Sequence, residues 1–197
     1  MDAPTINNIQ NETVRSPKSE FFREIGKAIF LILIIVLPIR IFIMSPFVVS
    51  GESMSPTFES SDYLIIDKIS YRLTDPQRGD VIVFRYPGDP SIFFIKRVIG
   101  LPGETVSLNN GVVTIKEHPN DSTGVTISEP YIVYPKEDTL SVTLGEHDYF
   151  VMGDNRYASS DSRVWGTLNK GFINGKVISR LLPITHAGWL PGEASYQ

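Results

Sequence analysis

Ser53 is the candidate nucleophile of this chain, because it directly follows the only long apolar run and stands in the segment SGESMSPT, residues 50–57. A serine hydroxyl is a weak nucleophile at neutral pH and needs an adjacent base to take its proton. A serine that follows a glycine is, taken alone, more often a turn residue than a catalytic one. A catalytic interpretation of Ser53 therefore depends on the base that the rest of the chain offers.

Lys96 is the best candidate for that base, because the three histidines of the chain stand in no recognisable motif. It lies in the segment FFIKRVIG, residues 93–100, where a strand over residues 92–99 would be apolar on both faces. A free lysine, with a pKa of about 10.4, is protonated at neutral pH. Burial lowers such a pKa by up to about 3 to 5 units and delivers a neutral amine. The alternative is a lysine whose stem packs while its ammonium reaches water.

A third segment, GDNRYASSDSR at residues 153–163, concentrates charges and small hydroxyls directly after an expected strand. Such a loop can pair carboxylates with guanidinium groups and orient a base by hydrogen bonds. The alternative is a solvated turn rich in Asp and Asn. Asp148, Asp154 and Asp161 are oxygen donors, but their spacing does not match a calcium loop, and two arginines compete for them. We therefore expect no metal ion and no cofactor.

The elements that would position these segments are short strands bounded by Gly, Pro and Asp. They are expected at residues 63–66, 80–86, 92–99, 105–108, 112–116, 149–152 and 176–182. The turn segments NNG at residues 109–111 and LPGE at residues 101–104 suggest hairpins. Residues 117–129 are typical of a surface loop. The pattern predicts a mostly β domain of short antiparallel strands over residues 45–197.

One transmembrane helix is expected before this domain, over residues 25–44. Residues 28–49 contain a single charge, Arg40, and are long enough as a helix to cross a hydrocarbon core of about 30 Å. Arg40 can extend its guanidinium to the interface. The alternative is a cleaved signal peptide, because residues 28–39 alone have the length of a signal-peptide core. Residues 1–24 are polar and are predicted to be a flexible tail.

The orientation of the helix follows from its basic flanks. Arg15, Lys18, Arg23 and Lys27 precede the apolar run, and beyond Arg40 the next basic residue is Lys68. This asymmetry places residues 1–24 in the cytoplasm and the β domain outside.

Composition narrows the classes of function. With 197 residues, of which 42% are hydrophobic and 20% charged, the chain can bury a real core. The formal charge of −4 and the lack of a basic stripe argue against nucleic acid as a partner. The absence of cysteine excludes disulfides, thiol nucleophiles and Cys-based zinc sites.

Four motifs in this order and spacing resemble those of bacterial type I signal peptidases. They are GESMSPT at residues 51–57, RGDV at 78–81, KRVIGLPGE at 96–104, and the segment from Gly153 to Arg163. Together with the anchor, the resemblance covers most of residues 25–185. It implies a single-pass membrane protein, a serine endopeptidase with a Ser/Lys dyad on a β-fold outside the cytoplasmic membrane. Its partners would be secretory preproteins, cut after a small-x-small sequence, with membrane lipid and the secretion translocon nearby.

The resemblance also assigns roles to individual residues. Ser53 would be the nucleophile and Lys96 the general base. Ser159 matches the hydroxyl residue that orients the lysine. Two ion pairs are implied, Arg97 with Asp154 and Arg163 with Asp161. The implied substrate pockets, which are shallow and accept small side chains, would be lined by Phe47, Val49, Met54, Phe58, Phe94 and Ile95.

The chain also departs from the pattern of the family. Gly51 stands where some members have a serine whose hydroxyl helps to bind the oxyanion. The oxyanion hole of this chain would therefore rely on backbone N–H groups, including that of Ser53. The segment over residues 105–144 is short, so we expect neither a large accessory domain nor further membrane spans.

Three other classes of protein share part of the pattern. A maturation peptidase dedicated to one or few exported proteins would carry every motif. A self-cleaving repressor would carry a DNA-binding domain where this chain has its apolar run. A non-enzymatic anchored β domain would be indifferent to the loss of Ser53 or Lys96.

Overall fold

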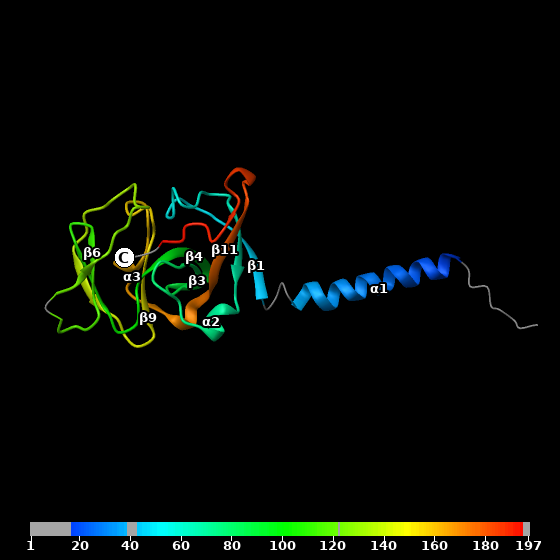
Figure 1. Cartoon of the computed structure of the whole chain (residues 1–197), viewed down its shortest axis with the longest axis horizontal. Coiled ribbons are helices and arrows are strands. Elements are labelled where there is room, and N and C mark those ends of the chain that lie inside the picture. Colours follow the sequence, from blue (N-terminus) through cyan, green and yellow to red (C-terminus); the bar gives the residue numbers. More distant parts are fainter. Residues whose placement is uncertain (1–16, 39–42, 122, 195–197) are drawn as a thin grey trace, which may run out of the picture. The chain divides into compact units, whose positions relative to one another are not determined.

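The structure is a computed structural model that describes residues 17–38, 43–121 and 123–194. It divides into an N-terminal unit, residues 1–40, and a second unit, residues 41–197. The described part of the N-terminal unit is helix α1 (Pro17–Pro38), shown in blue in Figure 1. Its residues 29–37 are nine consecutive apolar residues, all exposed. No helix among the described residues has both the length and the apolar character needed to cross a membrane.

These bounds correct the N-terminal prediction in two places. Residues 17–24 belong to α1 rather than to a flexible tail, and the helix begins at Pro17, because proline is tolerated in the first turn of a helix. The helix was expected to end at Met44, but Met44 begins strand β1 (Met44–Val48). Residues 1–16 of the expected tail and residues 39–42 of the expected span lie outside the described residues.

The second unit contains two antiparallel sheets. The larger has the order β1–β2–β11–β3–β4–β9–β10, with β12 pairing beside β11. After β1, its strands are β2 (Tyr63–Asp67), β3 (Val81–Tyr86), β4 (Asp89–Gly100), β9 (Asp148–Met152), β10 (Leu168–Asn169), β11 (Ile173–Leu182) and β12 (Gly188–Trp189). The smaller sheet has the order β7–β6–β5–β8. Its strands are β5 (Thr105–Asn109), β6 (Val112–Lys116), β7 (Val125–Thr126) and β8 (Leu140–Thr143).

Short helices join some of these strands. They are α2 (Ser70–Leu73), α3 (Ser162–Trp165), and the 3₁₀ turns η2 (Lys170–Phe172) and η3 (Ile184–His186). The mostly β prediction is confirmed, and each of the seven expected strands is present. Strands β1, β7, β8, β10 and β12 were not expected. The expected loop over residues 117–129 contains the two-residue strand β7.

The two expected hairpin turns have different outcomes. Asn110 and Gly111 join β5 to β6 with φ values of 50° and 79°. Positive φ at both central residues is the signature of the hairpin turn that Asn-Gly favours. The turn at residues 101–104 is also present, closed by a hydrogen bond from Glu104 N–H to the Leu101 carbonyl. It does not form a hairpin, because β4 and β5 belong to different sheets.

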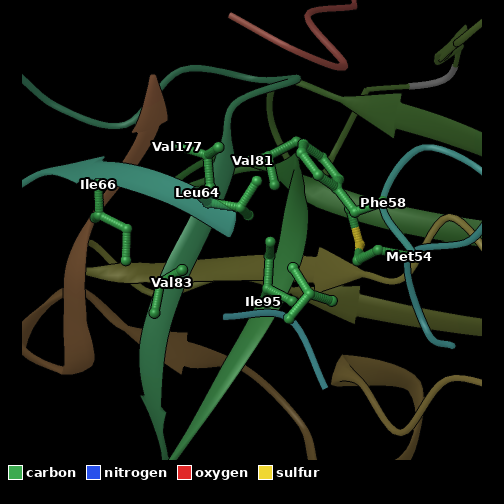
Figure 2. Packing of buried hydrophobic residues seen from close by; sticks show 9 residues of the cluster. Met54, Phe58, Leu64, Ile66, Val81, Val83, Ile95 and Val177 are labelled. Carbon is green, nitrogen blue, oxygen red and sulfur yellow. The ribbon is translucent and has the colours of Figure 1, made fainter. Parts of the chain in front are cut away.

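Three hydrophobic clusters form the core of this unit. One lies around β2, β3 and β11 and includes Met54 and Phe58, which point into it beside Ile95 and Val81 (Figure 2). A second fills the space between the smaller sheet and strands β4 and β9. A third joins β3, β4 and β9 on the other face. Strand β4 contributes to all three, so its residues 95–100 are buried on both faces. The sequence indicated this for the strand from residue 92 on, but Ile92 and Phe93 are exposed.

Candidate active site

Ser53 lies in the loop between β1 and β2, the first two strands of the larger sheet. The loop turns through hydrogen bonds from Ser55 N–H to the Glu52 carbonyl (3.1 Å) and from Phe58 N–H to the Met54 carbonyl (2.9 Å). Met54 and Phe58 are 1% and 0% exposed. These two side chains fix the loop to the core, while the Ser53 side chain lines a surface cleft.

Lys96 reaches Ser53 from the middle of β4. Its Nζ donates hydrogen bonds to Ser53 Oγ at 2.7 Å and to the Ile95 carbonyl at 2.9 Å. The residue is 3% exposed, and its ammonium lies 5.1 Å from the centre of the Phe94 ring. Packing on both faces of β4 therefore removes the amine from water and directs it at a single hydroxyl.

The surroundings of Lys96 favour its neutral form. Burial lowers the pKa of Lys96 to about 8, against the raising effect of the Asp161 and Asp154 carboxylates. The guanidinium of Arg163 also lowers it. An amine with this pKa is neutral in about one molecule in ten at pH 7, far more often than a free lysine, and a general base must be neutral to accept a proton.

The Arg97–Asp154 pair lies directly behind the Ser53 loop. Arg97 Nε and Nη2 bind Asp154 Oδ1 and Oδ2 at 2.8 and 2.5 Å, and both side chains are fully buried. Asp154 also accepts a hydrogen bond from Thr57 Oγ1 at 2.6 Å. Arg97 Nη1 donates to the carbonyls of Gly79 and Gly192. The expected pair is therefore present, and it connects the Ser53 loop to the segment after β9.

The Arg163–Asp161 pair is also present. Arg163 Nε and Nη2 donate to Asp161 at 2.8 and 2.7 Å, and Arg163 Nη1 donates to Asp138 at 2.6 Å. Asp161 accepts the Gly153 N–H at 3.0 Å. Burial alone would raise the pKa of Asp161, but its bonds to Arg163 and Gly153 hold that pKa below its usual value. Asp161 is therefore a fixed negative charge near Lys96.

Ser159 does not bond to Lys96 in the structure. Its Oγ is buried against Gly153 and lies close to the Asp161 carboxylate, whose pKa it helps to lower, while Lys96 Nζ uses Ser53 and the Ile95 carbonyl instead. A Cβ at Gly153 would collide with Ser159 Oγ and with the Ser53 carbonyl. The small residue at position 153 thus leaves room for the Ser53 backbone and the Ser159 side chain, and Asn155 N–H also donates to the Ser53 carbonyl at 3.1 Å.

A cleft of about 240 Å³ opens beside Ser53 and Lys96. Of the expected pocket residues, Phe47, Phe94 and Ile95 line it. Val49, Met54 and Phe58 do not, because they are buried in the core cluster. Their apolar character near Ser53 reflects packing and not a pocket. The sequence interpretation missed other lining residues, namely Val48, Ser50, Glu52, Phe93, Ala158 and Ser160.

The chain is similar to several known proteins. The model of the family described as "Signal peptidase, peptidase S26" matches residues 22–182. A "Probable signal peptidase I-1" from Synechocystis sp. is 38% identical over 92% of this chain and 93% of its own. A "Signal peptidase I" from Leptolyngbya laminosa is 39% identical over 92% of this chain and 88% of its own. A crystal structure of a signal peptidase I from Enterococcus faecalis V583 is 30% identical, covers 52% of this chain and 97% of its own, and has a TM-score of 0.45.

Proposed function

The chain belongs to the signal peptidase family, peptidase S26, and from that premise we propose that it removes N-terminal signal peptides from secreted preproteins by a Ser53/Lys96 mechanism. The observation that carries this proposal is the 2.7 Å contact between Lys96 Nζ and Ser53 Oγ. It is supported by burial that lowers the pKa of Lys96 to about 8. A lysine that merely packed its stem would reach water with its ammonium, whereas this one is 3% exposed.

In the acylation step, neutral Lys96 takes the Ser53 Oγ proton as Oγ forms a bond to the scissile carbonyl carbon. The tetrahedral intermediate collapses when the carbon–nitrogen bond breaks and the Lys96 ammonium gives its proton to the leaving amine. The products of this step are an ester on Ser53 and a free mature chain.

In the deacylation step, Lys96 takes a proton from water, and the resulting hydroxide equivalent attacks the ester carbonyl. Ser53 then leaves and recovers its proton from Lys96. In both steps the developing oxyanion is stabilised by backbone N–H groups, including that of Ser53. Gly51, exposed in the cleft, supplies no hydroxyl for this purpose.

The supporting residues hold this pair in place. Asp154 and Arg97 fix the Ser53 loop through Thr57, and Asp161 fixes Gly153 through its N–H. Ser159 serves as an orienting hydroxyl once rotation brings its Oγ toward the amine. Phe47, Phe94 and Ile95 shape shallow apolar pockets that accept small side chains before the scissile bond.

We also propose that the apolar part of helix α1, residues 25–38, anchors the chain in the cytoplasmic membrane, with residues 1–24 inside and the β domain, residues 45–197, outside. The nine exposed apolar residues of α1 support membrane contact, because a helix that is apolar on all sides needs an apolar environment. The basic residues before this run support the orientation. The site would then act on preproteins near the translocon, and the protein would also contact membrane lipid.

The test is cleavage of a purified preprotein by the detergent-solubilised chain, with the new N-terminus sequenced. The wild type and the control Lys116→Ala should cut after a small residue, whereas Ser53→Ala, Lys96→Ala and Lys96→Arg should not. A guanidinium cannot lose its proton at usable pH, so arginine does not rescue the site. Retained activity in Lys96→Ala would refute the mechanism. A survey of several preproteins then separates a general peptidase from one dedicated to few substrates.

A further inference from the structure

A second hollow, here called the acidic groove, lies next to the cleft that holds Lys96. It has a volume of about 660 Å³, against about 240 Å³ for the cleft. Glu52 and Ala158 line both. The two hollows therefore adjoin at Glu52, the residue before Ser53 in the chain, and at Ala158. The volume falls within the range of about 300–1,000 Å³ that is usual for ligand sites.

The direction of a bound peptide follows from this arrangement. A scissile bond at Ser53 has residues on both sides, and those before it occupy the cleft with Phe47, Phe94 and Ile95. The chain after the scissile bond must leave on the opposite side. The acidic groove shares Glu52 and Ala158 with the cleft and extends to Glu59, Tyr134 and Tyr157, none of which lines the cleft, so it offers that path.

The walls of the acidic groove have a consistent chemistry. One wall carries the carboxylates of Glu52 and Glu59, the latter held by a 2.7 Å hydrogen bond from Ser55 Oγ. Another carries the rings of Tyr134 and Tyr157, which are 48% and 78% exposed. None of the described residues that line it is Lys, Arg or His. Such a surface favours cationic over anionic side chains and offers rings for stacking.

We propose that the acidic groove binds the first residues of the mature protein, those that follow the scissile bond, and that Glu52 and Glu59 set a preference for basic over acidic side chains there. This inference rests on the proposed peptidase function. Tyr134 and Tyr157 provide contacts that do not depend on charge. The leaving segment is thus held in place while Lys96 protonates its amine.

The experiment uses fluorogenic peptides that are identical up to the scissile bond and differ after it. One carries Lys and one carries Glu at the second and third positions after the cut, and a third peptide ends one residue after the cut. For each, kcat/KM is measured with the solubilised full chain. The variants are the double substitution Glu52→Gln with Glu59→Gln, the single Tyr134→Ala, and the control Glu117→Gln, an exposed carboxylate just after β6.

We expect the wild type and Glu117→Gln to prefer the Lys peptide over the Glu peptide by about two- to fivefold, because exposed charge pairs contribute little. The double variant should bring this ratio close to one. Tyr134→Ala should lower kcat/KM for both long peptides equally and leave the short peptide unchanged.

Two outcomes would overturn the inference in distinguishable ways. If the wild type cleaves the peptides but the Lys-to-Glu ratio is the same in the double variant, the acidic groove does not read the mature segment, and the peptidase function stands. If the wild type cleaves neither these peptides nor a full preprotein, the proposed function itself fails, and the inference fails with it.

Discussion

Lys96 is buried at a position where neutral pH would normally keep it charged, and this has a cost in stability. Its pKa is about 8 in the folded protein against 10.5 for an ordinary lysine. The difference corresponds to about 3 kcal/mol against the charged form. The penalty is complete below pH 8, where both the folded and unfolded states carry the proton, and it vanishes as pH rises to about 10.5.

The Lys96→Met variant should therefore be more stable than the wild type at pH 7, by up to about 3 kcal/mol. Urea unfolding at pH 7, 8, 9 and 10 measures this difference, which should narrow steadily above pH 8. A variant that is less stable than the wild type at pH 7 would show that the bonds of Lys96 outweigh its burial penalty.

The same pKa sets the pH dependence of the reaction. Only the neutral amine can take the Ser53 proton, so kcat/KM should rise about tenfold per pH unit below pH 8 and level off above it. Steady-state cleavage of a peptide between pH 5.5 and 9.5 gives the profile. A rate that is already independent of pH from 6 to 8 would contradict a lysine base with this pKa.

At the scale of elements, the site depends on the buried Arg97–Asp154 ion pair, which joins strand β4 to the segment after β9. Asp154→Ala should destabilise the protein by about 3–5 kcal/mol, because it leaves the guanidinium of Arg97 buried without its carboxylate. Asp75→Ala removes a pair with Lys170 whose side chains are 70% and 39% exposed, and should cost less than about 1 kcal/mol. Thermal unfolding of both variants beside the wild type makes the comparison. If Asp154→Ala and Asp75→Ala lowered the free energy of unfolding by similar amounts, the buried pair would not be a structural connection.

The strands illustrate what sequence patterns can and cannot predict. Strands β2, β3 and β6 were predicted, because their side chains alternate or form short β-branched runs with clear ends. Strand β1 was missed, because its residues continue the apolar run of the helix and include Pro46, which argues against a strand. The turn at residues 101–104 was recognised locally, but local chemistry does not tell which sheet the next strand joins.

The site residues show the same limit. Motif order identified Ser53 and Lys96 as partners, and the family resemblance implied the two ion pairs. Val49, Met54 and Phe58 were assigned to the pocket although they fill the core, because apolar residues near a nucleophile serve both purposes equally well. Tyr134 belongs to a loop with no motif, so only the folded chain brings it to the acidic groove.

At the scale of the whole molecule, the division at residue 40 predicts independence of the second unit. A protein lacking residues 1–40 should keep its cooperative unfolding and cleave a short peptide at a rate within about threefold of the full chain. It should no longer sediment with vesicles, since it lacks the apolar residues of α1. Circular dichroism during heating, peptide cleavage and vesicle sedimentation test the three points. A truncated protein that is molten would show that the helix contributes to the β unit.

Arg97 donates hydrogen bonds to the carbonyls of Gly79 and Gly192. Because these residues lie far apart in the sequence, the order in which the chain is synthesised affects when the site can form. Gly192 is synthesised long after Ser53, so a nascent chain has the nucleophile long before it has every group that encloses Arg97. Cleaving power would then arise only after Gly192 has been synthesised and has joined the fold.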